Sequence, residues 1–545
     1  MMQPHSGPIR NNGHPLPAAL ATALLLVLAM PGPAGWWPLL FIALVPLLHS
    51  AMYQQPGRSA MLGLVTGLVY HLGLMYWIVI VLGRYGGLPL WISVPALLLL
   101  SLYMSLYMAL FAGLFSFLAG RYRSGPGPVT AMIFVAPIIW VGLDWLRGHL
   151  LTGFPWMDLG YGLYSRPVLI QVADLGGHGL VTFCLVLVNV LALWAIEYSS
   201  HHAPLRLSRT SRRLAAASCC FLVLAGGYSI LRYRHISTLA AAAPQTRVTV
   251  VQGSIPQDEK WTPGREKSTT TRYDRLSARA IAGKRPDLVV WPETALPFFP
   301  QQDTLFYRVT ALAAREKIWL LTGAPFFTIK NRRPGTGRTV SYFNSALLIN
   351  PSGWLAGRYD KQHLVPFGEY VPLRKYLPFL KPLVKNVGDF TPGRSILPLP
   401  AGPLKLGVLI CFESIFPDLA RQEAAAGANL LVNLTNDAWY GNSSAPHQSF
   451  AMTVFRAVET RRSLVRAANT GISGFVSPSG LILDQSPLFQ PLTITANVPL
   501  LEEKTIFVRF GYRFGPACLV LIPLLFFFRR RRNRSLKTVG MNLNP

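Results

Sequence analysis

The hydrophobic residues of this chain follow two different patterns, and the change between them falls near residue 244. Before that position, long apolar stretches follow one another with almost no charged residues inside them. A helix that crosses a membrane needs about 20 consecutive apolar residues. Seven stretches come near that length or exceed it, and they predict an α-helical transmembrane bundle: residues 16–30, 36–50, 60–82, 90–119, 129–145, 168–196 and 214–231.

The second pattern covers residues 245–508, where charged residues return and short β-branched runs alternate with polar, helix-like stretches. Short apolar runs bounded by turns predict buried strands, and their alternation with helices is typical of an α/β layered domain. The helices are expected at 268–281 and 449–461. The strands are expected at 248–251, 288–291, 319–322, 346–349, 406–410, 430–434 and 464–467, with a further short strand at 357–360.

A last apolar stretch, residues 514–528, is followed by five arginines between positions 529 and 534. It predicts a short final span with a basic anchor. The expected organisation is therefore a bundle of seven spans in residues 1–244, a polar domain in 245–508, and an eighth span with a basic tail in 509–545.

Composition supports a membrane protein: 51% of the residues are hydrophobic and only 14% are charged, against about 25% charged in soluble proteins. The net charge is +28, but 19 of the 23 acidic residues lie between Asp258 and Glu503. The larger share of the positive excess therefore falls on the membrane part, where arginines flank apolar stretches. The orientation of the spans in the bilayer explains this pattern. The sequence shows no basic patch with interleaved aromatic residues, so it does not predict nucleic-acid binding.

The loop arginines also predict an orientation. Loops rich in Lys and Arg remain in the cytoplasm, and one set of alternate loops carries arginines on the same side as the basic tail. This set contains Arg58, Arg121, Arg123, Arg206, Arg209, Arg212 and Arg213. The polar domain is then expected on the opposite face of the membrane, although that face also carries Arg84, Arg147, Arg232 and Arg234.

Three reactive side chains follow predicted strands in the polar domain: Glu293, Lys361 and Cys411. Active sites of α/β proteins form at the carboxyl ends of strands, so these three side chains are expected to converge. A thiol needs a base or a positive neighbour to become a nucleophile. Glu293 is the candidate base, and Lys361 is the candidate for stabilising an oxyanion.

Each of these residues also has a structural explanation when it is taken alone. A single Cys at a strand end more often packs in the core, and a single Glu or Lys is more often a turn or surface residue. His447 lacks a second ligand at metal spacing, so a hydrogen-bonded histidine is expected there and no metal site. Asp144 lies near the end of a span, where a carboxylate is a functional candidate; a pairing with Arg147, three residues further on, is the alternative. No nucleotide-binding motif is present, and no cofactor is expected.

Three blocks of sequence around the candidates resemble the catalytic blocks of the nitrilase superfamily. They are Trp291–Pro292–Glu293, the segment DKQHLVPFGEYVP at 360–372, and Cys411–Phe412–Glu413. With the predicted spans on both sides of them, nearly the whole chain resembles the apolipoprotein N-acyltransferase family. Segments 146–148, 152–156, 251–261 and 433–439 contribute to this resemblance.

The resemblance implies an αββα sandwich with a Glu293–Lys361–Cys411 triad. It also implies transfer of an acyl chain from a phospholipid, through a Cys thioester, to the α-amino group of a diacylglyceryl-cysteine at an apolipoprotein N-terminus. The location implied is the inner (cytoplasmic) membrane of a bacterium, with the catalytic domain on the periplasmic face.

The same resemblance assigns supporting residues. Glu369 and Glu413 match residues that support the triad, and Trp261 and Trp439 match substrate-binding positions on loops over the site. Phe412 departs from the family pattern, which has a Tyr after the nucleophile.

Two other functions use the same features. The first is a membrane-tethered amidase of the nitrilase type, in which water takes the acyl group from Cys411. The second is a non-catalytic carrier of lipid or lipoprotein, for which Cys411→Ser would keep full function.

Overall fold

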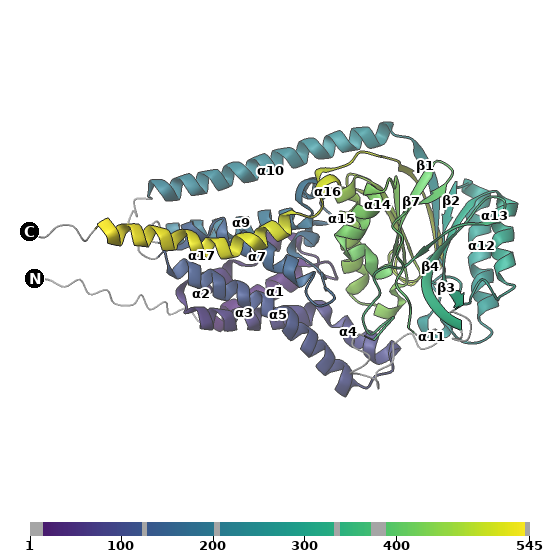
Figure 1. Ribbon diagram of the computed structural model, residues 1–545, viewed down its shortest axis with the longest axis horizontal. Helices are drawn as coiled ribbons and strands as arrows, with labels where there is room; N and C mark the ends of the chain where they lie inside the picture. The colour runs from purple at the N-terminus through teal and green to yellow at the C-terminus, as the bar shows by residue number, and fades with distance from the viewer. Residues whose placement is uncertain (1–14, 123–127, 201–207, 332–337, 372–388, 540–545) are drawn as a thin grey trace, which may run out of the picture.

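The computed structural model describes residues 15–122, 128–200, 208–331, 338–371 and 389–539. Arg123 and Arg206, named above among the loop arginines, and position 372 of the second catalytic block lie outside these residues. In the described part, a bundle of apolar helices is joined to a two-sheet domain (Figure 1).

The bundle is built from helices of very different lengths. Helices suit this part of the chain because each helix pairs its backbone polar groups internally, as a segment in lipid requires. Its elements are α1 (Pro15–Ala29), α2 (Val45–Tyr53), α3 (Pro56–Met75), α4 (Trp77–Val79), the π-helix η2 (Ile80–Tyr85), α5 (Leu90–Gly120), α6 (Pro128–Met132), α7 (Val135–Arg147), α9 (His178–Ser200), α10 (Arg209–Ala242) and α17 (Phe514–Val539).

Four helical stretches of the described residues are long and apolar enough to cross a membrane: 90–120, 128–147, 178–199 and 209–242. A fifth is formed if α3 and the segment Trp77–Tyr85 count as one span, bent by 50°. The other apolar helices, Pro15–Ala29, Trp37–Tyr53 and Phe514–Phe526, coincide with the remaining predicted stretches. They have 10–17 residues each and are too short to count as spans by length alone. The membrane bundle is thus confirmed, while the count of eight spans stays a prediction.

The predicted stretch 168–196 is wrong in its first third. A short 3₁₀ helix, η4 (Pro167–Leu169), and the one-turn helix α8 (Ala173–Gly176) occupy that region, and α9 begins only at His178. Gly177 has φ 70° and ends α8. Only glycine adopts this conformation without strain, and hydrophobicity alone does not detect such a break.

The two-sheet domain, expected at residues 245–508, contains two six-stranded sheets. The first has the order β12-β1-β2-β3-β4-β5 and the second the order β11-β10-β9-β8-β7-β6. In each sheet three strands run parallel, namely β1, β2 and β3 in the first and β7, β8 and β9 in the second. The strands are β1 (Gln245–Gln252), β2 (Leu288–Val290), β3 (Trp319–Asn331), β4 (Arg338–Ile349), β5 (Leu355–Asp360), β6 (Leu399–Ala401), β7 (Leu404–Ile410), β8 (Leu430–Thr435), β9 (Ser463–Ala468), β10 (Gly474–Val476), β11 (Ile482–Gln485) and β12 (Leu492–Pro499).

The two sheets face each other across an apolar layer to which both contribute, with Val250 and Val290 on one side and Val408 and Val432 on the other. Helices α12 (Glu266–Lys284) and α13 (Phe306–Glu316) cover the outer face of the first sheet. Helices α14 (Pro417–Ala425) and α15 (Ala445–Thr460) cover the second sheet and lie between it and the bundle (Figure 1). This αββα sandwich confirms the predicted fold class.

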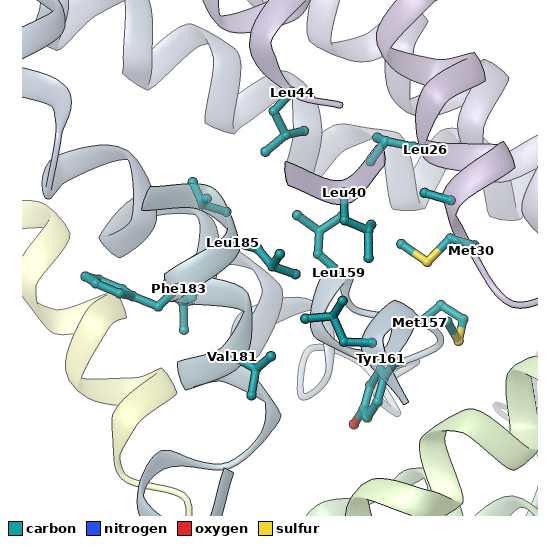
Figure 2. Packing of buried hydrophobic residues seen from close by; sticks show 14 of the residues in the cluster. Leu26, Met30, Leu40, Leu44, Met157, Leu159, Tyr161, Val181, Phe183 and Leu185 are labelled. Carbon is teal, nitrogen blue, oxygen red and sulfur yellow. The ribbon is translucent and has the colours of Figure 1, made fainter. Parts of the chain in front are cut away.

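The bundle and the sandwich share one continuous apolar core. Figure 2 shows the bundle side of it, where Leu26, Leu40 and Leu159 pack together. The same cluster continues into Phe455 of α15 and Leu409 of β7. Because apolar contacts run without interruption from the membrane helices to the strand that precedes Cys411, the two-sheet domain is held against the bundle and not merely tethered to it.

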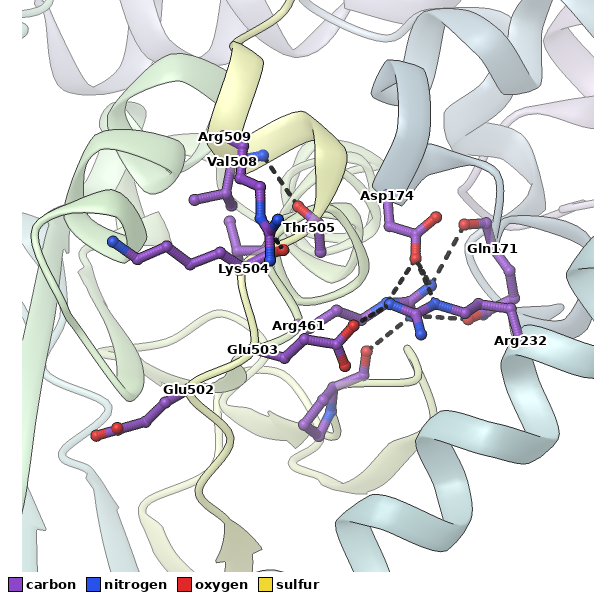
Figure 3. A network of polar contacts seen from close by, with 12 residues as sticks. Gln171, Asp174, Arg232, Arg461, Glu502, Glu503, Lys504, Thr505, Val508 and Arg509 are labelled. Carbon is purple, nitrogen blue, oxygen red and sulfur yellow. Dashed lines mark hydrogen bonds and ion pairs between the residues drawn. The ribbon is translucent and has the colours of Figure 1, made fainter.

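A buried polar network reinforces this junction (Figure 3). Arg461, at the end of α15, is fully buried and places its guanidinium 2.7 Å from the Asp174 carboxylate of α8. Arg232 of α10 binds the same carboxylate at 2.8 Å and Glu503 at 2.7 Å. The Gln171 side chain accepts from Arg461 at 2.7 Å. Residues from four distant parts of the chain are therefore fixed relative to one another.

Candidate active site

Glu293 lies in a tight turn after β2. Thr294, the next residue, has φ 45°, in the left-handed region. Gly323 of β3 packs directly under the turn, since a Cβ there would come within 2.5 Å of the Thr294 backbone nitrogen. The Glu293 carboxylate is 7% exposed, and it accepts hydrogen bonds from the Asn344 side chain at 2.8 Å and the Asn436 backbone at 2.9 Å. Both of its oxygens are thus fixed in direction.

Lys361 follows β5 and is 1% exposed. Its Nζ lies 2.9 Å from a Glu369 oxygen and 3.7 Å from Glu293 Oε1. Burial alone would lower the pKa of Lys361, but the Glu369 and Glu293 carboxylates outweigh it and hold the pKa above its usual value. The site therefore contains a permanent cation beside Glu293.

Asn344 of β4 joins these groups. Its side-chain amide donates to Glu293 Oε1 and to Glu369 Oε1, both at 2.8 Å, and its backbone carbonyl accepts from the Lys361 backbone N–H at 2.9 Å. Glu369 also accepts from the Val365 backbone at 2.8 Å. The two carboxylates, the lysine and the amide form one network around Lys361.

Cys411 lies at the junction of β7 and the 3₁₀ helix η5 (Cys411–Ile415) with φ 53°. A non-glycine residue in this conformation costs about 1–3 kcal/mol, and such strain concentrates at functional sites. Burial, together with the Glu293 charge, raises the pKa of the Cys411 thiol to about 12, against the opposing effect of Lys361. The resting thiol is therefore protonated, and its reaction requires a base to remove the proton.

Glu413 connects the Cys411 turn to the Lys361 segment. Its carboxylate is fully buried and accepts from the Ile410 backbone at 2.7 Å, from Gln362 N at 2.6 Å and from His363 N at 3.1 Å. The Tyr359 hydroxyl donates to it at 3.1 Å. Since Ile410 belongs to one sheet and Gln362 follows a strand of the other, Glu413 fixes the spacing of the two sheets at the site.

Aromatic side chains lead from the bundle to the nucleophile. Phe412 stacks on Phe154 with the ring centroids 6.2 Å apart, and Phe154 stacks on Trp156 at 5.8 Å. Trp156 meets Trp77 of α4 at 4.8 Å. The Gln448 side chain of α15 accepts hydrogen bonds from both indoles, at 2.7 and 3.2 Å. Four aromatic side chains thus form a continuous wall from the membrane helices to the residue after Cys411: Trp77, Trp156, Phe154 and Phe412.

The two candidate substrate-binding tryptophans lie on separate elements. Trp261 follows the one-turn helix α11 (Gln257–Lys260) and packs near Leu364 and Phe390. Trp439 lies in the 3₁₀ helix η6 (Asp437–Tyr440) and meets Tyr85 of the π-helix, with the centroids 6.1 Å apart. Both are partly exposed.

The structure thus brings Glu293, Lys361, Glu369, Cys411 and Glu413 together. Sequence reasoning missed the partners that orient them, above all Asn344, Asn436 and the buried lysine Lys260. Asn436 lies inside one of the segments that carry the family resemblance, which was the available signal. Asn344 lies in a strand where an isolated amide gave none.

One further cluster of titratable groups lies on the bundle side. Ligand atoms of Asp144, Asp158 and His178 lie within 4.8 Å of one another. These groups already have partners within the protein: Asp144 pairs with Arg147, one of the two alternatives that the sequence left open, and His178 Nδ1 lies 2.7 Å from Asp158. Ion pairing and hydrogen bonding account for their proximity without a metal. Half-buried His447 is not part of any such cluster among the described residues.

Comparison with known proteins gives two family matches. Residues 22–191 match the apolipoprotein N-acyltransferase N-terminal domain, and residues 247–504 match the carbon-nitrogen hydrolase family. The apolipoprotein N-acyltransferase of Geobacter metallireducens is 40% identical over 92% of both chains. That of Methylococcus capsulatus is 31% identical over 95% of this chain and 96% of its own.

Solved structures similar to the catalytic domain belong to the nitrilase superfamily. Nit3 of Saccharomyces cerevisiae is 20% identical, with 47% of this chain and 90% of that chain covered and a TM-score of 0.36. An amidase from a Nesterenkonia species is 22% identical, with the same two shares covered and a TM-score of 0.33. The identity to full-length relatives carries the assignment: this chain belongs to the apolipoprotein N-acyltransferase family and is an acyltransferase with a carbon-nitrogen hydrolase domain.

Proposed function

We propose that this chain transfers an acyl chain from a membrane phospholipid to the α-amino group of the N-terminal diacylglyceryl-cysteine of an apolipoprotein, through a thioester on Cys411. One observation carries the proposal: Glu293, Lys361 and Cys411 converge in a buried site at the end of an aromatic wall that begins in the membrane bundle. The resulting product is a triacylated lipoprotein.

In the first step, Glu293 takes the proton of the Cys411 thiol as Sγ attacks the ester carbonyl of the phospholipid. Lys361 stabilises the negative oxygen of the tetrahedral intermediate. The ester C–O bond then breaks, and the proton held by Glu293 passes to the departing lysophospholipid hydroxyl. The acyl chain remains on Cys411 as a thioester.

In the second step, the acceptor amine attacks the thioester carbonyl. Glu293 takes a proton from the attacking nitrogen, and Lys361 again stabilises the oxyanion. The C–S bond breaks, and the Cys411 sulfur recovers its proton from Glu293. An amide and the free enzyme result, so no cofactor or metal is required for the balance of the reaction.

A phospholipid donor fits the position of the site. Exposing an acyl chain to water costs about 0.8 kcal/mol per CH₂, so a two-chain donor remains in the bilayer while one ester group enters the site. The wall formed by Trp77, Trp156, Phe154 and Phe412 supplies an apolar surface along that route. Trp261 and Trp439 lie on the loops around the opening and would contact the substrates.

We further propose that the catalytic domain faces the periplasm and that the bundle spans the inner membrane. The end of α5 lies beside the middle of α17, since the Arg121 guanidinium lies over the rings of Phe117 and Phe526. In Figure 1, the start of α10 and the end of α17 lie at the end of the bundle remote from the sandwich. Arginine-rich loops at that end support a cytoplasmic assignment for it.

Two of the four arginines named on the opposite face, Arg147 and Arg232, weigh little against this assignment because they are paired with carboxylates. Arg147 pairs with Asp144, and Arg232 pairs with Asp174 and Glu503. A paired arginine adds little net positive charge to its side of the membrane.

The direct test uses the full-length chain in lipid and a phospholipid with a fluorescent acyl chain. Wild type and the matched control Cys219→Ala, which removes an exposed thiol of α10, should both retain the label covalently. Cys411→Ala should not. Addition of a diacylglyceryl-cysteine peptide should then move the label from the enzyme to the peptide.

Two outcomes contradict the proposal. Labelling of the Cys411→Ala variant would show that another residue carries the acyl chain. Turnover of a small amide without any labelling from phospholipid would instead favour the tethered amidase.

A further inference from the structure

Lys260 is a buried lysine beside the triad to which the proposed steps give no role. It ends the one-turn helix α11, directly before Trp261, and is 1% exposed. Its Nζ donates to the Glu293 backbone carbonyl at 3.2 Å and to the Thr294 hydroxyl at 2.6 Å. Burying an amine is unfavourable unless it is hydrogen-bonded, and both of these partners belong to the turn that carries Glu293.

That turn needs support from outside itself. Thr294 is β-branched and yet has φ 45°, a conformation that costs about 1–3 kcal/mol and persists only where surrounding contacts enforce it. Gly323 supports the turn from β3, where there is no room for a side chain. Lys260 supports the turn from α11, since its Nζ donates to the Glu293 carbonyl and to the Thr294 hydroxyl.

The same one-turn helix also reaches the Glu293 carboxylate. Gln257 Oε1 accepts from the Asn436 side chain at 2.7 Å, and the Asn436 backbone N–H donates to Glu293 Oε2 at 2.9 Å. Helix α11 therefore fixes Glu293 in two ways: through Lys260 at its backbone and through Asn436 at one carboxylate oxygen. General-base catalysis depends on this direction, because the accepting oxygen must reach the proton that it removes.

We propose that Lys260 is a positioning residue of the acyl-transfer site: it fixes the Glu293–Thr294 turn and thereby aims the Glu293 carboxylate at the Cys411 thiol. The inference rests on the proposed function, in which Glu293 is the base. It also ties the base to the segment that bears Trp261, since Lys260 and Trp261 are adjacent.

The role does not require Lys260 to be charged. Burial lowers the pKa of Lys260 to about 7, against the opposing effects of Glu293 and Cys411. An ammonium has three N–H donors and a neutral amine two, so both protonation states can serve the two acceptors. The positioning therefore persists across neutral pH.

The first measurement is the rate of thioester formation on Cys411 at saturating fluorescent phospholipid. Lys260→Met should lower this rate by about 10-fold or more, because small misplacements of a catalytic group have effects of this order. The KM for phospholipid and the unfolding temperature should change little. Thr294→Val, which removes only the hydroxyl acceptor, should lower the same rate less. Lys267→Met, at an exposed position of α12, should have no effect.

The second measurement distinguishes positioning from a general structural role. If Lys260 acts through Glu293, Lys260→Met should lower the rate of thioester formation by less than about 3-fold in a Glu293→Asp background. The reason is that the effects of residues that act as a unit are not additive. Equal losses in both backgrounds, or no loss in wild type, would overturn the inference. If Lys260→Met does not fold, Thr294→Val is compared in the wild-type and Glu293→Asp backgrounds in its place, and the same two outcomes test the inference. Loss of labelling in Cys411→Ala tests the proposed function separately, so the two can fail independently.

Discussion

Phe154, in the loop after α7, stacks on Phe412, the residue after Cys411, with ring centroids 6.2 Å apart and planes 24° apart. Phe412 is 7% exposed and also meets Phe416 edge-on at 5.1 Å. Since Phe154 belongs to the membrane part and Phe412 to the catalytic domain, this stack sets where Cys411 lies relative to the bundle. The ring thus has a packing role, which a Tyr at this position would share.

Removing the Phe412 ring should therefore damage the site, and a Tyr should preserve it. Phe412→Ala should lower the rate of thioester formation by at least about 10-fold, since the Cys411 turn loses its contact with the bundle. A buried Phe→Ala change also costs about 3–5 kcal/mol of stability. Phe412→Tyr should remain within about 3-fold of wild type. Fluorescent acyl labelling and thermal unfolding measure both effects, and full activity of the Ala variant would refute the role.

Asn344 should be as important as the triad, because its amide separates two carboxylates. In the wild-type protein the Asn344 amide donates to Glu293 and to Glu369, both at 2.8 Å. Asn344→Asp keeps the shape of the side chain but replaces this donor by a third negative charge between the two carboxylates. Repulsion should misdirect both carboxylates and lower thioester formation by about 100-fold. Asn350→Asp is a matched control, since that side chain only accepts hydrogen bonds, from Ser352 and Trp354. Similar activity of the two variants would show that the amide donor is not needed.

Much of the fold was predictable from the chain because its strongest signals are local. Every predicted strand overlaps an observed strand, since central strands of a sandwich are apolar throughout. The predicted segments 319–322 and 346–349 are only the buried parts of the much longer strands β3 (Trp319–Asn331) and β4 (Arg338–Ile349). Strands β6, β10, β11 and β12 were not predicted. In β11, three of the four residues are exposed and carry no hydrophobic pattern. The break before α9 was missed because it depends on the φ angle of Gly177 and not on hydrophobicity.

The candidate site was predictable only in part, for a related reason. Cys411, Glu293 and Lys361 each follow a strand, so the strand pattern and the family resemblance both point to them. Asn344 contacts Glu293 across 51 residues of sequence, and Lys260 reaches it across 33. Contacts of this kind arise from the register of sheets and turns, which hydrophobic periodicity does not specify.

Glu423 of α14 should make stability depend on pH. Its side chain is buried, neither oxygen has a hydrogen-bond partner among the described residues, and burial together with Glu413 raises its pKa from 4.5 to about 8. The folded state therefore holds this proton more tightly than the unfolded state does. The stability that the proton contributes is complete below about pH 4.5 and is lost progressively as pH rises to about 8.

Glu423→Gln should remove this dependence, because an amide does not titrate. The unfolding temperature of the variant, relative to wild type, should rise by several degrees between pH 6 and pH 8, as each pKa unit corresponds to about 1.4 kcal/mol. Glu502→Gln, at an exposed position, is the control and should show no such change. A constant difference between variant and wild type at both pH values would mean that Glu423 is ionised in the folded protein.

The Arg461–Asp174 pair should be essential for the junction of bundle and sandwich. Arg461→Met leaves the buried Asp174 carboxylate with Arg232 and the Tyr228 hydroxyl as its remaining partners. Removing one member of a buried ion pair typically costs about 3–5 kcal/mol, because the other charge stays buried. Asp174→Asn should be comparably unfavourable, since Arg461 would then be buried without a counter-charge. The double variant should be less unstable than the sum of the two single variants, because both remove the same interaction. Thermal unfolding of the four proteins in detergent measures this coupling, and strictly additive losses would show that the two side chains stabilise the junction independently.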